Sequence, residues 1–134
     1  MLKWRNCSPV NKKLFMENQN EKIKIINEKV SLSELKIIAV ERFGDMVKAV
    51  VDTDKEIMAV GGEMHADEET ELLKNGSKQE SLWGINLYPD NLESDFVEFD
   101  SMINIRPRQN NRSRGVENAQ IREKILEIVK KLIG

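Results

Sequence analysis

The sequence predicts an α+β fold, with a single, mostly antiparallel sheet of about five strands and three helices. Three observations support this prediction. Apolar residues recur at helical spacing in three segments, and short runs typical of strands occur in five others. Glycine, proline, asparagine and aspartate separate these segments. The resulting order is β-α-β-β-α-β-β-α, and its hairpins, which alternate with helices, favour a sheet with helices over one face.

The predicted elements follow a polar N-terminal segment. Residues 1–20 show no steady period, so we expect a flexible extension ahead of one domain over residues 21–134. Trp4, Leu14 and Phe15 are the residues of this extension that could dock on another surface. The alternation in "KIKII" predicts the first strand, over residues 22–26.

The first helix has a clear start and stop. Ser31 and Glu34 form a capping box, in which each side chain accepts a hydrogen bond from the other residue's backbone. Gly44 is placed to end the helix. The predicted apolar face consists of Leu32, Leu35, Ile38, Ala39 and Phe43.

The middle of the chain predicts a hairpin and a second helix. Residues 46–62 hold two β-branched runs around the turn-forming "DTDK", and a Gly-Gly pair stops the second run. A helix should follow over residues 66–76. Its acidic first turn suits the positive end of the helix dipole, and its terminal Asn-Gly is a common stop.

The last third predicts two strands and a helix. "SLWGINLYPD" is typical of a central strand, and "FVEFDSMINIRP", residues 96–107, reads as a longer strand that Pro107 ends. The final helix should begin near Asn118. Its buried face at helical spacing consists of Ile121, Ile125, Ile128, Val129 and Leu132.

The totals limit the classes of function. The chain has 134 residues, 40% hydrophobic and 33% charged, with a net charge of −2, so no overall field favours nucleic acid or membrane. No apolar run is long enough to cross a bilayer, and the first residues lack a secretory signal. The single cysteine, Cys7, can form neither an internal disulfide nor a metal cluster. We expect a cytoplasmic protein.

The only histidine, His65, is the first candidate for chemistry. It follows two glycines at a helix start, where free N–H groups suit an anion. His65 could act as a general acid or base, with Glu68 or another nearby carboxylate orienting it. The alternative is a histidine that caps the helix or packs. We predict no metal site, because a second histidine, a nearby thiol and known ligand spacings are missing.

An arginine-rich loop is the second candidate. Guanidinium groups bind phosphate and carboxylate with two hydrogen bonds, and loops on a rigid sheet often carry binding residues. The alternative is that these arginines pair with the acidic middle of the chain. The candidate ligand-binding residues are Asn104, Arg106, Arg112, Ser113 and Arg114.

Polar residues within the predicted strands are a third signal. If helices covered only one face of the sheet, the other face could present Asn86, Asp100, Asn104 and Arg106 together. Trp83 is better read as a core residue than as a stacking platform. The adjoining glycine indicates a close backbone approach or a bulge.

Three motifs carry a resemblance to a known family. These are "GGEMHADEE", "LLKNGSKQESLWGINLYP" and "FDSMINIRP…NRSRGV". The chain resembles a small prokaryotic family of domains of unknown function, from about Ile23 to the C-terminus. This resemblance implies a self-contained domain of about this size. It brings no activity, cofactor or catalytic residue.

The combined observations favour a small-ligand or phosphate-type anion site near His65 and the loop over residues 106–114, with catalysis left open. The alternative is a non-catalytic module for protein interaction or self-association through the sheet face or edge. Nucleic acid is disfavoured, since the loop lacks aromatic residues and the chain is acidic. The sequence points to no particular cofactor.

Overall fold

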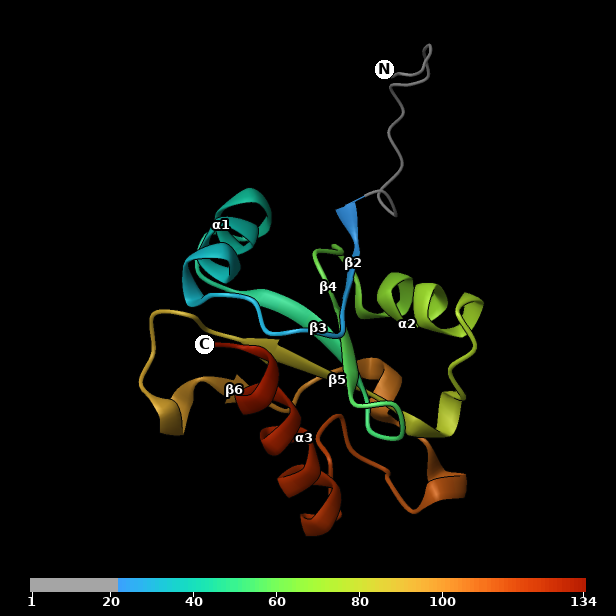
Figure 1. Ribbon diagram of the computed structural model, residues 1–134. Helices are drawn as coiled ribbons and strands as arrows, with labels where there is room; N and C mark the ends of the chain where they lie inside the picture. Colours follow the sequence, from blue (N-terminus) through green and yellow to red (C-terminus); the bar gives the residue numbers. More distant parts are fainter. Residues whose placement is uncertain (1–21) are drawn as a thin grey trace, which may run out of the picture.

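The computed structural model describes residues 22–134, in which five antiparallel strands form one sheet (Figure 1). The spatial order β2-β4-β3-β5-β6 confirms the predicted α+β class and order of elements. The strands are β2 (Lys24–Ile26), β3 (Val47–Asp52), β4 (Ile57–Val60), β5 (Leu82–Leu87) and β6 (Val97–Glu98). The expectations for residues 1–20 fall outside the described residues.

Helix α1 (Leu32–Arg42) begins at the predicted capping box. The Glu34 backbone N–H donates to Ser31 Oγ at 3.1 Å, and the Ser31 N–H donates to Glu34 Oε1 at 3.2 Å. These bonds satisfy two groups that the first turn would otherwise leave open. The helix ends at the predicted glycine, because Gly44 takes the left-handed φ of 94° that favours glycine.

The other two helices also form where the pattern predicts them. Helix α2 (His65–Lys74) follows the β3–β4 hairpin. Helix α3 (Ala119–Leu132) begins at Asn118, whose side-chain oxygen accepts from two backbone N–H groups of the first turn. Four of the five apolar residues predicted for its inner face are fully buried.

Helices cover both faces of the sheet, so the expectation of one covered face is wrong. Helices α1 and α3 pack on the face that carries Val51 and Ile85, while α2 packs on the opposite face, against Val50 and Leu82 (Figure 1). The physical reason is that every residue of β5, and all but one of β3, is buried. A strand with apolar residues in succession needs cover on both sides.

The long strand predicted over residues 96–107 is also wrong. Only β6 forms a strand in this stretch, and Met102–Asn104 and Pro107–Gln109 are short 3-10 turns. The Asn104 side chain takes the place of a strand here: its oxygen accepts from Gly84 N–H at 2.8 Å and its nitrogen donates to Gly84 O at 3.0 Å. One side-chain amide therefore satisfies β5 where a neighbouring backbone would otherwise pair.

Candidate functional site

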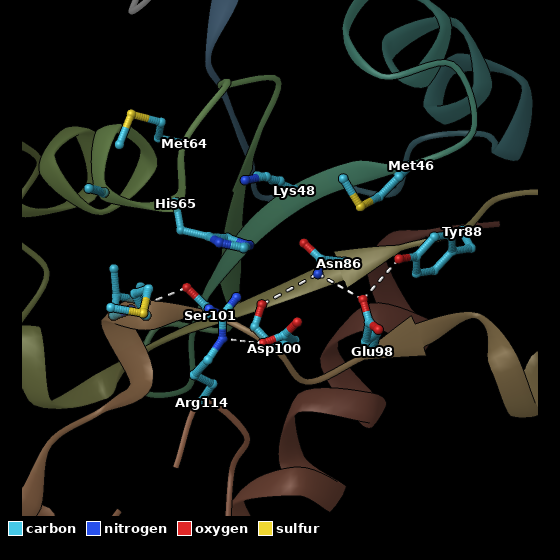
Figure 2. Close-up of a pocket in the computed structure, with 13 residues that line it drawn as sticks. Met46, Lys48, Met64, His65, Asn86, Tyr88, Glu98, Asp100, Ser101 and Arg114 are labelled. Carbon is cyan, nitrogen blue, oxygen red and sulfur yellow. Dashed lines mark hydrogen bonds and ion pairs between the residues drawn. The ribbon is translucent and has the colours of Figure 1, made fainter. Parts of the chain in front are cut away.

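A cavity of about 490 Å³ lies on the α2 face of the sheet, where α2 begins and leaves strands β3, β5 and β6 uncovered (Figure 2). Gly84 makes room for its wall. A Cβ atom at Gly84 would lie 2.6 Å from Ser101 Cβ and 3.2 Å from His65 Cδ2. The glycine thus allows two side chains to lie directly on the strand, as the sequence indicated.

The floor of the cavity is a row of polar residues across three strands. Lys48 of β3 is paired with Asn86 of β5, which is paired with Glu98 of β6. Residues directly opposite in a sheet lie on the same face, so the three side chains project together. All three line the cavity.

His65 stands on this floor from the first turn of α2, and it is 8% exposed. Its Nε2 lies 2.8 Å from the Ile85 carbonyl oxygen. Since a carbonyl can only accept, Nε2 carries the proton and donates, and Nδ1 is the ring's acceptor in the neutral form. Burial lowers the pKa of His65 below its ordinary 6.5, and Lys48 lowers it further, while Ile85, Asp100 and the Asn86 side chain act in the opposite direction.

Asn86 has an acceptor that no described residue satisfies. Its nitrogen donates to Glu98 Oε1 at 2.9 Å and to the Asp100 carbonyl at 3.4 Å, and both of these atoms can only accept. The amide orientation is therefore fixed, and Oδ1 must point the other way. By distance and angle, this buried oxygen makes no hydrogen bond within residues 22–134, although it lies near enough to the His65 ring to favour the ring's charged form. Figure 2 shows it turned from Glu98 toward the side where Lys48 and His65 lie.

Two carboxylates line the far side of the cavity and have different partners. Asp100 Oδ1 accepts from Arg114 Nε at 2.6 Å, so this pair is neutral as a unit. Glu98 accepts only from neutral groups in the described chain, Asn86 and the Tyr88 hydroxyl at 2.9 Å. Burial and the Glu98 carboxylate raise the pKa of Tyr88 to about 12, so its hydroxyl stays a donor.

Lys48 is the cation of the cavity without an anionic partner. It is half-buried and forms no ion pair with residues 22–134. Its Nζ lies 5.5 Å from the centre of the Phe43 ring, a contact that leaves the charge in place. The start of α2 adds positive potential. Met64 provides no side-chain cap, and the N–H groups of His65 and Ala66 make no hydrogen bond in the described residues.

Glu68, the other predicted catalytic residue, lies behind the cavity and does not line it. Its side chain is fully buried, and Oε2 accepts from the Gly62 N–H at 2.9 Å. Burial raises the pKa of Glu68 well above its ordinary 4.5, although Gly62 and Lys48 favour the charged form. Glu68 therefore holds the Gly-Gly segment against α2, and it forms no ion pair with Lys48.

Asn104 and Arg106 hold the end of β5 and do not line the cavity. Asn104 is fully buried and binds Gly84 and the Arg114 carbonyl. The Arg106 guanidinium lies over the Trp83 ring, 4.2 Å from its centre, and donates to the Gln79 and Leu82 carbonyls. Trp83 is 2% exposed, which confirms its prediction as a core residue.

Arg112 and Ser113 form a turn closed by a carboxylate of the same loop. Their backbone N–H groups both donate to Glu117 Oε2, each at 2.9 Å. These two bonds, with the Ser113 hydroxyl, hold the pKa of Glu117 below its ordinary value. An internal carboxylate thus occupies the position that an external anion would take.

The cavity brings together His65 and Arg114, together with Asn86 and Asp100, which the sequence singled out as polar strand residues. Lys48 and Glu98 also line the cavity, and neither is among the site residues predicted from the sequence. A signal for Lys48 was present, because a lysine interrupts the apolar run "MVKAVV".

The chain belongs to a family that matches over residues 24–132 and is described as "Protein of unknown function (DUF5674)". The comparisons with curated proteins and with solved structures gave no match. No helix among the described residues is long and apolar enough to span a membrane. No group of three or more histidine, cysteine, aspartate or glutamate residues within residues 22–134 is arranged to hold a metal ion.

Proposed function

We propose that this domain binds a small ligand with an anionic group in the cavity at the start of α2. The observation that carries the proposal is the uncompensated cation Lys48, half-buried at the floor of a concave site. The cavity volume of about 490 Å³ lies in the range of roughly 300–1,000 Å³ typical of ligand sites. An anion beside Lys48 would also meet the free N–H groups of the first turn of α2.

His65 supplies a neutral acceptor in this site. The bond to Ile85 fixes the ring, and the lowered pKa keeps it uncharged at neutral pH. In that form it accepts a hydrogen bond from a ligand through Nδ1. If the domain is catalytic, Nδ1 is the atom that would take a proton, since Nε2 is engaged with the backbone.

Arg114 takes part through Asp100. Because their ion pair is short, Arg114 fixes the Asp100 carboxylate at the cavity wall and leaves Lys48 as the charge that an anion would meet first. Arg112 does not line the cavity, so we leave it, with Ser113, Asn104 and Arg106, outside the proposed ligand site.

The test is calorimetric titration with inorganic phosphate, supported by thermal unfolding in phosphate and in chloride at matched ionic strength. A ligand that binds the folded state stabilises it by mass action. Lys48→Gln should weaken phosphate binding about tenfold or more, as expected for a lost charged contact. Arg112→Ala removes an exposed cation outside the cavity and is the matched control. Equal effects of phosphate and chloride on the wild type would exclude the anion site.

A second candidate function, self-association, is favoured by an apolar groove of about 680 Å³ on the other face of the sheet. It lies between α3, the start of α1 and the edge strand β6. Its apolar lining includes Leu32, Phe96, Val97, Phe99, Leu126 and Ile133. Light scattering after size exclusion tests this candidate: a wild-type dimer that Leu126→Lys converts to a monomer would support it, and a monomeric wild type would exclude it.

A further inference from the structure

We infer that the ligand is an α-amino acid with an apolar side chain, whose ammonium group binds beside its carboxylate. The inference rests on the proposed anion site and specifies its ligand. It is drawn from three features of the cavity: an unsatisfied acceptor next to an unsatisfied cation, two carboxylates beyond them, and a rim of methionines.

The unsatisfied acceptor is Asn86 Oδ1. Asn86 is 7% exposed, and a buried oxygen with no partner among the described residues costs free energy that a bound donor would recover. Lys48 is its direct neighbour across the sheet. A ligand that bound Lys48 with an anionic group alone would place negative charge beside this oxygen. A ligand with a donor adjacent to its anionic group would satisfy both side chains.

The charges around the cavity favour a positively charged donor. Lys48 and Arg114 contribute two positive charges, Glu98 and Asp100 two negative charges, and His65 is neutral. Arg114 and Asp100 cancel each other, so Lys48 and Glu98 remain, one on each side of Asn86. The complement of this arrangement is a zwitterion of zero net charge. Its carboxylate faces Lys48 and the start of α2. Its ammonium binds Asn86 Oδ1, and the Glu98 carboxylate, which lies on the other side of the Asn86 amide, attracts it at longer range.

The rim determines what the rest of the ligand is. Met46, Met64 and Met102 line the cavity together with Ile103, above the polar floor. Met64 and Met102 are 55% and 65% exposed. Methionine side chains adapt to apolar groups of differing shape. An amino acid bound through its two charged groups would therefore extend an aliphatic side chain between them.

The experiment compares ligands that differ in one group. L-Leucine, 4-methylpentanoate and L-leucinamide share the same aliphatic body, but the second lacks the ammonium and the third lacks the carboxylate charge. Glycine lacks the body. Calorimetric titration of the full chain should show L-leucine binding most tightly, with a loss of about tenfold or more for each missing charged group.

Two variants assign the ammonium contact. Glu98→Gln keeps an acceptor for Asn86 and Tyr88 but removes the charge, so it should reduce the preference for L-leucine over 4-methylpentanoate by roughly threefold or more. Glu123→Gln makes the same change of charge on an exposed residue of α3 and should leave the preference unchanged. Asn86→Ala should abolish the preference. If that variant fails to fold, Glu98→Gln still decides.

The outcomes separate the two proposals. If phosphate and 4-methylpentanoate bind in a Lys48-dependent way but the ammonium adds nothing, the amino-acid inference is overturned and the anion site stands. The inference is also overturned if Glu98→Gln leaves the preference intact. If none of the anions or amino acids binds, both proposals fail.

Discussion

The His65 cavity and residues 111–117, the second half of the arginine loop and the turn after it, differ in how fully their polar groups are satisfied. In the loop, the two N–H bonds of the Asn111 amide are shared among three carbonyls and its oxygen accepts from the Glu117 N–H, while Glu117 accepts from two N–H groups. In the cavity, Asn86 Oδ1, Lys48 and the first N–H groups of α2 have no such partners in the described chain. The loop is richer in charge, but the cavity has more capacity left for a ligand.

The comparison shows that a density of binding-type residues is a poor guide to a site. A loop of this length exposes many backbone groups, and each must find a partner or water. Side chains supply those partners: Asn111 donates to carbonyls of the loop itself, and Arg122 of helix α3 donates to the Val116 and Glu117 carbonyls. A site is instead marked by polar groups that the fold has buried or half-buried and left open.

The largest expected effect is on the loop. Asn111→Ala removes both donors and the acceptor of an amide that is 2% exposed, and it leaves the Asn104 and Gly115 carbonyls and the Glu117 N–H without this partner. We expect it to lower the free energy of unfolding by about 3 kcal/mol or more, measured by urea denaturation. Arg112→Ala should change it by less than about 0.5 kcal/mol. Similar free energies of unfolding for the two variants would mean that the hydrogen bonds of Asn111 do not stabilise the loop.

The second effect concerns the buried Glu68, which lies behind the cavity. Because burial raises the pKa of Glu68, the folded state holds a proton that the unfolded state releases above its ordinary pKa of 4.5. Stability is therefore lost as pH rises through this window. Glu68→Gln keeps an acceptor for Gly62 and removes the ionisation, so at pH about 8 it should be at least as stable as the wild type.

The same comparison at pH about 4, below the ordinary pKa, should remove any advantage of Glu68→Gln, since both states of the wild type are then protonated. Urea denaturation at the two pH values provides the measurement. A variant that is much less stable than the wild type at the higher pH would show that Glu68 is charged in the folded protein and contributes an ion pair.

The sequence predicted the elements better than the site, for a physical reason. The start of a helix depends on residues that are close together in the chain. The capping box of Ser31 and Glu34 and the cap at Asn118 could therefore be predicted from the sequence. The apolar run in "VKAVV" does not alternate, so the sequence already indicated that helices cover both faces of the sheet. The break in the predicted long strand could not be predicted from the sequence, because it depends on Asn104 binding Gly84, twenty residues away.

The cavity shows the same limit. The Gly-Gly-x-x-His pattern located His65, but its neighbours Lys48 and Glu98 join it only through the register of three strands. A polar residue in a strand reads as a solvent-facing position until the strand order is known. The order β4-β3-β5-β6 is what places these charges in one row.

A third effect is a shift in the titration of His65, which gives an unambiguous NMR signal because the chain has one histidine. Its midpoint should lie below 6.5, and its ring should be the Nε2–H tautomer. Because the unfolded chain takes up this proton more readily, stability should fall as pH drops below 6.5. Lys48→Gln should raise the midpoint, since it removes a repelling charge, whereas Arg112→Ala should not. A midpoint at or above 6.5 in the wild type would contradict the buried, neutral ring.

The smallest expected effect tests whether the loop carries its own anion. The pKa of Glu117 is lowered by hydrogen bonds from the N–H groups of Arg112 and Ser113, so its contribution to stability is complete above the ordinary pKa of 4.5. That contribution is lost as pH falls through the lower, folded value. The side chain is exposed, so the change is better followed locally than by unfolding. The amide protons of Arg112 and Ser113 should shift together with a midpoint below 4.5, and Glu117→Gln should abolish that titration.

In that variant, phosphate should shift these amides more than it does in the wild type, because the internal carboxylate no longer competes for the two donors. Amides that respond to phosphate equally in both proteins would show that Glu117 does not close the loop, and the contrast with the cavity would then disappear.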